Sequence, residues 1–268
     1  MTSAHDLTDL VRLSRTLGEP ERRLAILAEG NTSQRVAKDQ LAVKATGRSL
    51  RHASAEDFVL VSLRRLSEIV DDSEAGDADV ARYFDEIEAE QGLRPSVEAL
   101  LHVVCVVDAG ATTVAHTHPE SVNALLCSDR ADVLAGPPIF PDQVVVIGRR
   151  ALLVPYSDPG VVLARVVRAR LAEHARQWGM PRAIYLQNHG LVALGSSASQ
   201  VLQLTEMADK VSRVLAATLS LGNVVPMTEE SAERIDTRDD EQIRRTALAR
   251  ATLQQPGPIE KDVSDLRS

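Results

Sequence analysis

The stretch AIYLQNHGLVALG, residues 183–195, restricts the fold more than any other part of the sequence. Two apolar runs typical of β-strands are separated only by Asn188, His189 and Gly190. We expect a tight turn at this point, because glycine lets the backbone bend without a side-chain penalty. Strands are therefore expected on either side of the turn, at 183–187 and 191–195.

Strand and helix patterns alternate along the rest of the chain. Strands are predicted at QLAVKAT (40–46), DFVLVSL (57–63), TTVAH (112–116), DQVVVIG (142–148) and RALLVPY (150–156). Helices are predicted at 7–17, 22–28, 96–107, 158–178 and 199–221. The short links around 142–148 and 150–156 favour antiparallel pairing. The sequence therefore predicts a mixed α/β domain whose helices cover a central sheet with substantial antiparallel pairing.

The chain is expected to divide into one large domain and a C-terminal extension. Residues 1–225 hold all the predicted strands and form the domain. Residues 226–254 are rich in charge and are predicted to form a helix that packs on it. Residues 255–268 offer little to bury and are predicted to be a mobile tail.

The composition excludes several classes of protein. The 38 acidic residues against 30 basic ones argue against nucleic acid as a partner. No apolar run approaches the roughly 20 residues of a membrane span, and the N-terminal segment lacks the layout of a signal peptide. Cys105 and Cys127 lie in apolar surroundings without CxxC spacing, so we expect small core residues in a reducing compartment. A cytoplasmic protein is expected.

Three of the seven histidines form a candidate metal site. His116 and His118 stand two positions apart at the end of a predicted strand, so their side chains point to the same face, and Pro119 ends the strand there. His189 occupies the predicted turn at 188–190. Each alone is also typical of a strand-end or turn residue. Together, three neutral imidazoles with an open fourth position suit a catalytic zinc site. His102 is expected to be a hydrogen-bonded core residue.

Five segments resemble the class II aldolase/adducin family, which includes fuculose-phosphate and rhamnulose-phosphate aldolases and ribulose-phosphate 4-epimerase. The matching segments are EGNTS (29–33), ATGRSL (45–50), RPSVEALLH (94–102), HTHP (116–119) and NHG (188–190). They occur in the order found in the family, over roughly residues 8–225. The resemblance implies a three-layer αβα sandwich with a predominantly antiparallel sheet. It also implies a homo-oligomer, commonly a cyclic tetramer with sites between subunits.

The resemblance assigns the chemistry to four residues. His116, His118 and His189 match the zinc ligands of the enzymatic members, although another divalent transition metal would also suit imidazole ligands. Glu98 matches the acidic residue that moves the proton at the carbon next to the carbonyl in the aldolases. We expect Glu98 in the first turn of a helix, ionised in the free enzyme and beside the metal or displaced from it by substrate.

A second set of residues is predicted to bind the substrate phosphate. Asn31, Thr46, Gly47 and Ser96 match family positions that hold this group. The EGNTS and ATGRSL segments are polar, glycine-containing turns that could present backbone N–H groups to an anion. Arg48 could add a bidentate contact. A carboxylate would fit the same donors.

Two departures from the family pattern leave the reaction open. Val97 replaces a serine that commonly precedes the acid and so removes a phosphate donor. Phe140 lies about where the sugar-phosphate aldolases carry a tyrosine that protonates the leaving aldehyde. The sequence favours a metal-dependent aldolase that cleaves a ketose 1-phosphate. The alternatives are an epimerase, a decarboxylase or a dehydratase of a sugar phosphate on the same metal site, and, last, a non-enzymatic adducin-like interaction module.

Overall fold

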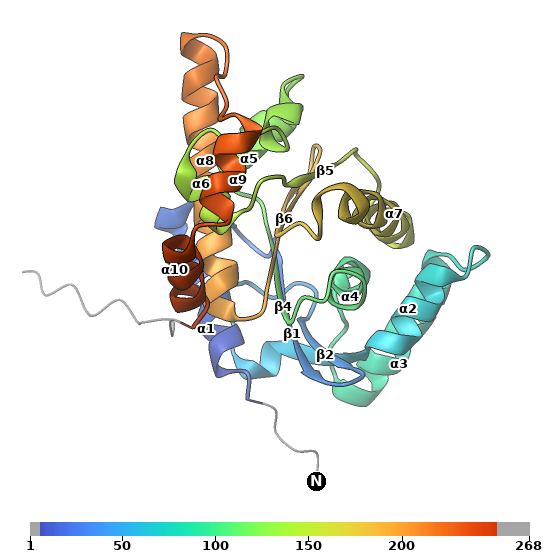
Figure 1. Ribbon diagram of the computed structural model, residues 1–268. Coiled ribbons are helices and arrows are strands. Elements are labelled where there is room, and N and C mark those ends of the chain that lie inside the picture. The colour runs from blue at the N-terminus through green and yellow to red at the C-terminus, as the bar shows by residue number, and fades with distance from the viewer. Residues whose placement is uncertain (1–5, 251–268) are drawn as a thin grey trace, which may run out of the picture.

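The computed structural model describes residues 6–250 and places a seven-stranded sheet within them between two layers of helices (Figure 1). The strands are β1 (Asn31–Ala37), β2 (Gln40–Lys44), β3 (Phe58–Ser62), β4 (Thr113–Thr117), β5 (Leu152–Val154), β6 (Ala183–Leu186) and β7 (Gly190–Gly195). Their order across the sheet is β3-β2-β1-β4-β7-β6-β5. Since β4 stands at the centre with both faces covered, all of its residues are buried.

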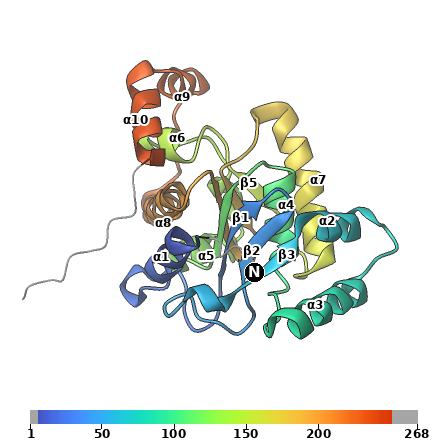
Figure 2. The same cartoon turned by 90° about the horizontal axis from the view of Figure 1, so that it is seen from below.

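Helices cover both faces of the sheet, which confirms the predicted three-layer sandwich (Figures 1 and 2). One face carries α2 (Leu63–Asp71), α3 (Asp77–Gln91), α4 (Ala99–Val107) and α7 (Val161–Trp178). The other carries α1 (Thr8–Leu17), α5 (Glu120–Leu126), α6 (Pro141–Val146) and α8 (Ala198–Leu221). Each layer has its own apolar core against the sheet, and burial of that surface is the main stabilising contribution. Three short 3₁₀ turns lie at Pro20–Arg22, Ala55–Asp57 and Ala131–Leu134.

Most strand pairs are antiparallel, as predicted, including the β6–β7 hairpin. The short links around 142–148 and 150–156, from which antiparallel pairing was predicted, do not join antiparallel strands. Residues 141–146 form the helix α6, because Pro141 at its first position has the φ that a helix requires. β5 pairs parallel with β6, with Val154 opposite Leu186. The antiparallel character comes instead from the β1–β2, β2–β3 and β6–β7 pairs and from the long-range pairs β1–β4 and β4–β7.

Two predictions in the N-terminal region are also wrong. Residues 22–28 do not form a helix, because Arg23 and Leu27 adopt positive φ angles of 55° and 52°, which a right-handed helix cannot contain. The EGNTS segment is not a turn throughout, since β1 already begins at Asn31. The predicted core residue Cys127 is exposed, while Cys105 is buried.

The C-terminal extension forms two helices where a single one was predicted. They are α9 (Glu229–Asp236) and α10 (Asp239–Arg250), and both pack against α6, with α10 also on α8. Thr228 caps the first turn of α9 through its hydroxyl. The division of the chain at residue 225 stays a prediction, and the predicted tail 255–268 lies outside the described residues. Within those described, none of the helices is long and apolar enough to cross a bilayer.

Candidate metal centre

His116 is the next-to-last residue of β4, the central strand of the sheet. It pairs with Asn31 on β1 and with Val192 on β7, and its side chain is completely buried. His118 follows one residue beyond the strand, directly before Pro119. As predicted from the two-residue spacing, both imidazoles lie on the same side.

His189 reaches the same point from the turn between β6 and β7. The turn was predicted, but its details differ, because Asn188 and not Gly190 takes the positive φ of 56°. Gly190 is needed for a different reason. A Cβ atom at this position would lie 2.6 Å from Cδ2 of His118 and 2.6 Å from the carbonyl oxygen of Thr117. The absence of a side chain at Gly190 lets the hairpin approach the end of β4 closely.

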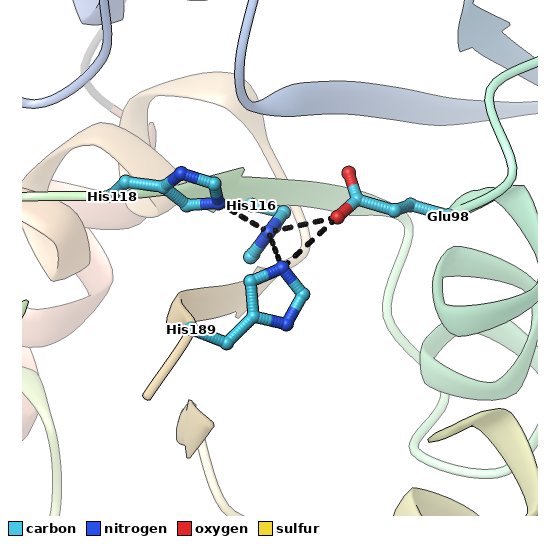
Figure 3. Close-up of side chains that lie close together, drawn as sticks. All are labelled: Glu98, His116, His118 and His189. Carbon is cyan, nitrogen blue, oxygen red and sulfur yellow. Dashed lines mark hydrogen bonds and ion pairs between the residues drawn. The ribbon is translucent and has the colours of Figure 1, made fainter. Parts of the chain in front are cut away.

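Glu98 lies directly before α4 and not within its first turn, where it was predicted. The helix begins at Ala99, and Glu98 is its N-cap residue with an approximately helical backbone. Ser96 accepts hydrogen bonds from the start of the helix, through Oγ from the N–H of Glu98 at 3.4 Å and through its carbonyl from the N–H of Ala99 at 2.9 Å. The Glu98 side chain is 14% exposed and points toward the histidines (Figure 3).

Glu98, His116, His118 and His189 converge on one point (Figure 3). Nε2 of His116 lies 2.9 Å from Nε2 of His118 and 3.2 Å from Nε2 of His189. Oε1 of Glu98 lies 3.2 Å from Nε2 of both His116 and His189. Ligands at zinc–nitrogen bond lengths in a tetrahedral site are separated by about 3.3 Å. Four of the six separations, which join His116 to the other three groups and Glu98 to His189, are close to this value, and all four atoms lie within 4.8 Å of one another.

In His116 and His118, the hydrogen bond that Nδ1 makes determines whether Nε2 carries a hydrogen. Nδ1–H of His116 donates to the carbonyl oxygen of Leu191 at 3.0 Å, and Nδ1–H of His118 donates to the Glu29 carboxylate at 3.2 Å. In the neutral rings, Nε2 then carries a lone pair and no hydrogen. Lone pairs and a carboxylate oxygen that face one another at about 3 Å repel unless a cation lies among them. These residues fit a divalent metal ion.

The electrostatics of the cluster favour the same conclusion. Burial opposes ionisation of Glu98, but His116 and His189 outweigh it and hold the pKa of the carboxyl well below its usual value. Burial and His116 lower the pKa of His118 to about 4, which keeps its lone pair available. Burial also lowers the pKa of His116, but Glu98 outweighs it and raises this pKa. A proton and a metal ion therefore compete for the space between Glu98 and His116.

The residues predicted to bind phosphate lie on three segments, which are the start of β1, the turn after β2 and the residues before α4. Asn31 is buried next to His116, and its Nδ2 donates to Oε2 of Glu98 at 3.4 Å. The N–H of Thr46 donates to the carbonyl of Arg94 at 3.0 Å, which joins the turn containing Thr46 and Gly47 to the segment of Ser96. Arg48 is half exposed and its Nε lies 3.3 Å from Asp57.

Two residues of this region were not identified from the sequence. Glu29 orients His118, as described above. Lys44 at the end of β2 is buried, and its ammonium group donates to the carbonyls of Ala45 and Arg48 beneath the 45–50 turn. Burial lowers the pKa of Lys44 to about 8, against the opposing charges of Glu98 and Asp57. A lysine inside the otherwise apolar run QLAVKA was the signal that could have revealed it.

The two departures from the family pattern have different surroundings. Val97, directly before Glu98, is 46% exposed. Phe140 packs against the apolar core on the α8 side of the sheet, where Lys210 lies over its ring at 5.2 Å from the centroid.

Comparison with known proteins identifies the family. The family described as class II aldolase and adducin N-terminal domain matches residues 8–216. The chain belongs to this family. Its members' fold also appears in solved structures with 17–22% sequence identity. The chain superposes with a TM-score of 0.62 on L-fuculose 1-phosphate aldolase (17% identity; 90% of this chain and 99% of that one). The TM-score is also 0.62 for YgbL from Klebsiella pneumoniae, a candidate aldolase/epimerase/decarboxylase (22% identity; 85% and 95%).

A curated relative extends well beyond the shared domain. The chain is 25% identical over 206 residues to the uncharacterized oxidoreductase YuxG of Bacillus subtilis, which is 74% of this chain and 27% of that protein. The chain thus spans about a quarter of the length of this relative. The class II aldolase fold and a Glu and three-His cluster able to bind a metal ion are the features established for the chain itself.

Proposed function

We propose that the protein is a metal-dependent aldolase that cleaves a ketose 1-phosphate, or a similar sugar phosphate, into dihydroxyacetone phosphate and an aldehyde. The observation that carries this proposal is the convergence of three imidazole Nε2 atoms and the carboxylate of Glu98, all within 4.8 Å of one another. Zinc is the metal that best suits three imidazoles and one carboxylate.

The cluster would hold the ion and act on the substrate through distinct groups. His116, His118 and His189 would bind the ion permanently. Glu98 fills the position that a substrate oxygen would take. A bound divalent ion would supply a Lewis acid, worth several kcal/mol, for the negative charge left on the substrate when the carbon–carbon bond breaks.

Glu98 would move the proton at the carbon next to the carbonyl. In the cleavage direction its acid form gives this carbon a proton, and in the condensation direction the carboxylate removes it. The low pKa of the carboxyl in the free protein suits the second role. Entry of substrate would displace the carboxylate from the histidines and exclude water, which raises its pKa toward a useful range.

The phosphate would bind at the turn beside Glu98. Thr46 and Gly47 are exposed there, so that the Thr46 hydroxyl and the Gly47 backbone N–H would be the donors, and Ser96 lies on the adjoining segment. The Lys44 ammonium beneath the turn adds positive charge, and Arg48 lies at its outer edge. Together these groups would favour a compact anion.

A product assay tests the proposal. The zinc-loaded protein is incubated with phosphorylated ketoses and with their unphosphorylated counterparts, and dihydroxyacetone phosphate is followed. We expect release from one or more ketose 1-phosphates and much less turnover of the unphosphorylated sugars. Absence of carbon–carbon cleavage for every ketose phosphate in the screen would reject the aldolase.

Phe140 supports a second candidate reaction on the same centre. A phenylalanine cannot take the proton from the hydroxyl that becomes the aldehyde oxygen in cleavage, or return it in condensation. Epimerisation, decarboxylation or dehydration of a sugar phosphate would handle that proton differently. NMR of the products distinguishes these reactions, because an epimer keeps every carbon, a decarboxylase releases one and a dehydratase releases water.

The proposal also includes a homotetramer in the cytoplasm, by resemblance to the enzymatic members of the family. Light scattering of the purified protein measures the number of subunits directly. A monomer at micromolar concentration would contradict the tetramer.

A further inference from the structure

α4 contacts β1 through two side-chain pairs, and only one of them belongs to the metal centre. Glu98 and His102 lie four positions apart, on one face of the helix. Asn31 and Ser33 lie two positions apart, on one face of the strand. Asn31 faces Glu98, with 3.4 Å between Nδ2 and Oε2, and Ser33 faces His102, with 2.7 Å between Oγ and Nδ1.

The inner pair is the better hydrogen bond. Ser33 and His102 are both completely buried, and burial lowers the pKa of His102 to about 3, so the ring is neutral. The Asn31–Glu98 contact is near the limit of a hydrogen bond, and Asn31 Oδ1 has no partner among the described residues. Of the two contacts, the one between Ser33 and His102 is therefore the shorter and the more deeply buried.

Apolar packing alone would leave the position of α4 less well defined. Every residue of the helix from Ala99 to Val106 is buried, and most are aliphatic. Burial of such surface is strong but non-directional, so a small rotation or shift changes its free energy little. The N-cap residue Glu98 makes no capping bond with its side chain, and its own N–H has only a long contact of 3.4 Å with Oγ of Ser96. A buried, directional contact one turn below Glu98 supplies the missing constraint.

We propose that the Ser33–His102 hydrogen bond positions the carboxylate of Glu98 at the fourth vertex of the metal centre. Ser33 and His102 are positioning residues, since neither is among the four residues that converge there. The inference rests on the metal-binding role given to those four residues under the proposed function. It adds that the Ser33–His102 hydrogen bond, which lies outside the cluster, determines the position of Glu98 within it.

Cobalt binding provides the test, because the visible absorption of bound Co²⁺ reports the number and arrangement of its ligands. The probe is the metal alone, titrated into the metal-free protein, so no substrate is needed. Glu98→Gln is the reference variant, and its spectrum shows what loss of the carboxylate does. We expect Ser33→Ala to shift the spectrum in the same direction and to weaken cobalt binding about tenfold, as for other groups that orient a metal ligand.

Two substitutions of His102 separate the hydrogen bond from simple packing. His102→Leu fills much of the space but cannot bond to Ser33, whereas His102→Asn is smaller and keeps an amide group near the position of Nδ1. If the hydrogen bond positions Glu98, the leucine variant has the altered spectrum and the asparagine variant the wild-type one. If packing alone matters, the asparagine variant has the altered spectrum and the leucine variant the wild-type one. That result would overturn the inference.

A matched control is the hydrogen bond made by Thr32, the residue next to Ser33 on β1. Ser14 of α1 and the neighbouring Thr32 of β1 form a buried hydroxyl pair at 2.6 Å, on the opposite face of the sheet. Ser14→Ala should lower the thermal midpoint to a degree similar to Ser33→Ala and leave the cobalt spectrum unchanged. If Ser14→Ala shifts the spectrum as much as Ser33→Ala, the effect is general loosening and the inference is wrong.

Failure of the inference can be told from failure of the proposed function. A Glu98→Gln spectrum identical to that of the wild type would overturn both, because the carboxylate would then not lie at the metal. A changed Glu98→Gln spectrum, together with unchanged Ser33→Ala and His102→Leu spectra, would overturn the positioning role alone.

Discussion

The candidate metal centre lies at the central strands of the sheet, where His116 is paired on both sides. Thr46, Gly47 and Arg48, in contrast, lie in an exposed turn. His116 is held by pairing on both sides of its strand and is completely buried. The turn is held mainly from beneath, by the Lys44 ammonium. The difference indicates that the centre tolerates almost no change, while the turn can vary to suit one anion or another. Substitutions at the two places should therefore differ in size of effect.

The largest effect is expected for His116→Ala. Loss of this ligand removes the metal and with it several kcal/mol of charge stabilisation, so activity should fall at least about 10⁴-fold. Metal analysis of the purified variant should show far less than one equivalent. Retention of a full equivalent of tightly bound metal would show that the cluster is not the binding site.

Glu98→Gln should reduce turnover about 10²- to 10³-fold, the usual contribution of a proton-transferring residue. Three imidazoles remain, so the variant should still bind metal, though more weakly. Steady-state kinetics of the metal-loaded variant measures this. An unchanged rate would show that another group moves the proton.

Gly190→Ala should weaken zinc binding about 30-fold without removing any ligand. The added methyl group would lie 2.6 Å from the ring of His118 and must displace it. Competition with a chromophoric chelator measures the affinity. Gly76→Ala is the matched control, because its added methyl group would meet nothing within 4 Å. Equal affinities in the two variants would mean that the close approach of the hairpin is unimportant.

The exposed turn should respond more mildly. Thr46→Val removes one hydroxyl donor, and a hydrogen bond to a charged group is worth about 1.5–3 kcal/mol. KM for the phosphorylated substrate should rise about tenfold or more, with metal affinity unchanged. KM for an unphosphorylated analogue serves as the control and should not change. A fall in kcat without a change in KM would place Thr46 in the reaction and not in anion binding.

The smallest effect concerns pH. Burial lowers the pKa of Lys44 to about 8, so its charge is present at pH 7 and largely lost at pH 9. Anion binding should weaken as the pH rises through this value, about fivefold for the roughly 1 kcal/mol that one nearby charge contributes. Inhibition by inorganic phosphate measures it. Lys44→Met should bind phosphate weakly at both pH values, and a pH dependence retained in this variant would exclude Lys44 as its source.

The sequence predicted the metal centre better than it predicted the turn. The spacing of His116 and His118 and the tight turn around His189 depend on local rules that hold wherever strands occur, and the structure brings these residues together. Resemblance to the family added Glu98. Burial of Lys44 depends on how β2 packs against distant segments, which no local pattern reveals. The same limit explains residues 142–148, where a run of valines typical of a strand forms part of a helix.

The convergence of Glu98, His116 and His189 links distant parts of the chain, since 91 positions separate Glu98 from His189. Closing a loop of that length requires the central strands to be in register first. A nascent chain that has emerged only as far as residue 150 would contain two of the three histidines and would lack the β6–β7 hairpin. If the four residues bind a metal ion as proposed, the complete site therefore forms only after this hairpin has paired with β4.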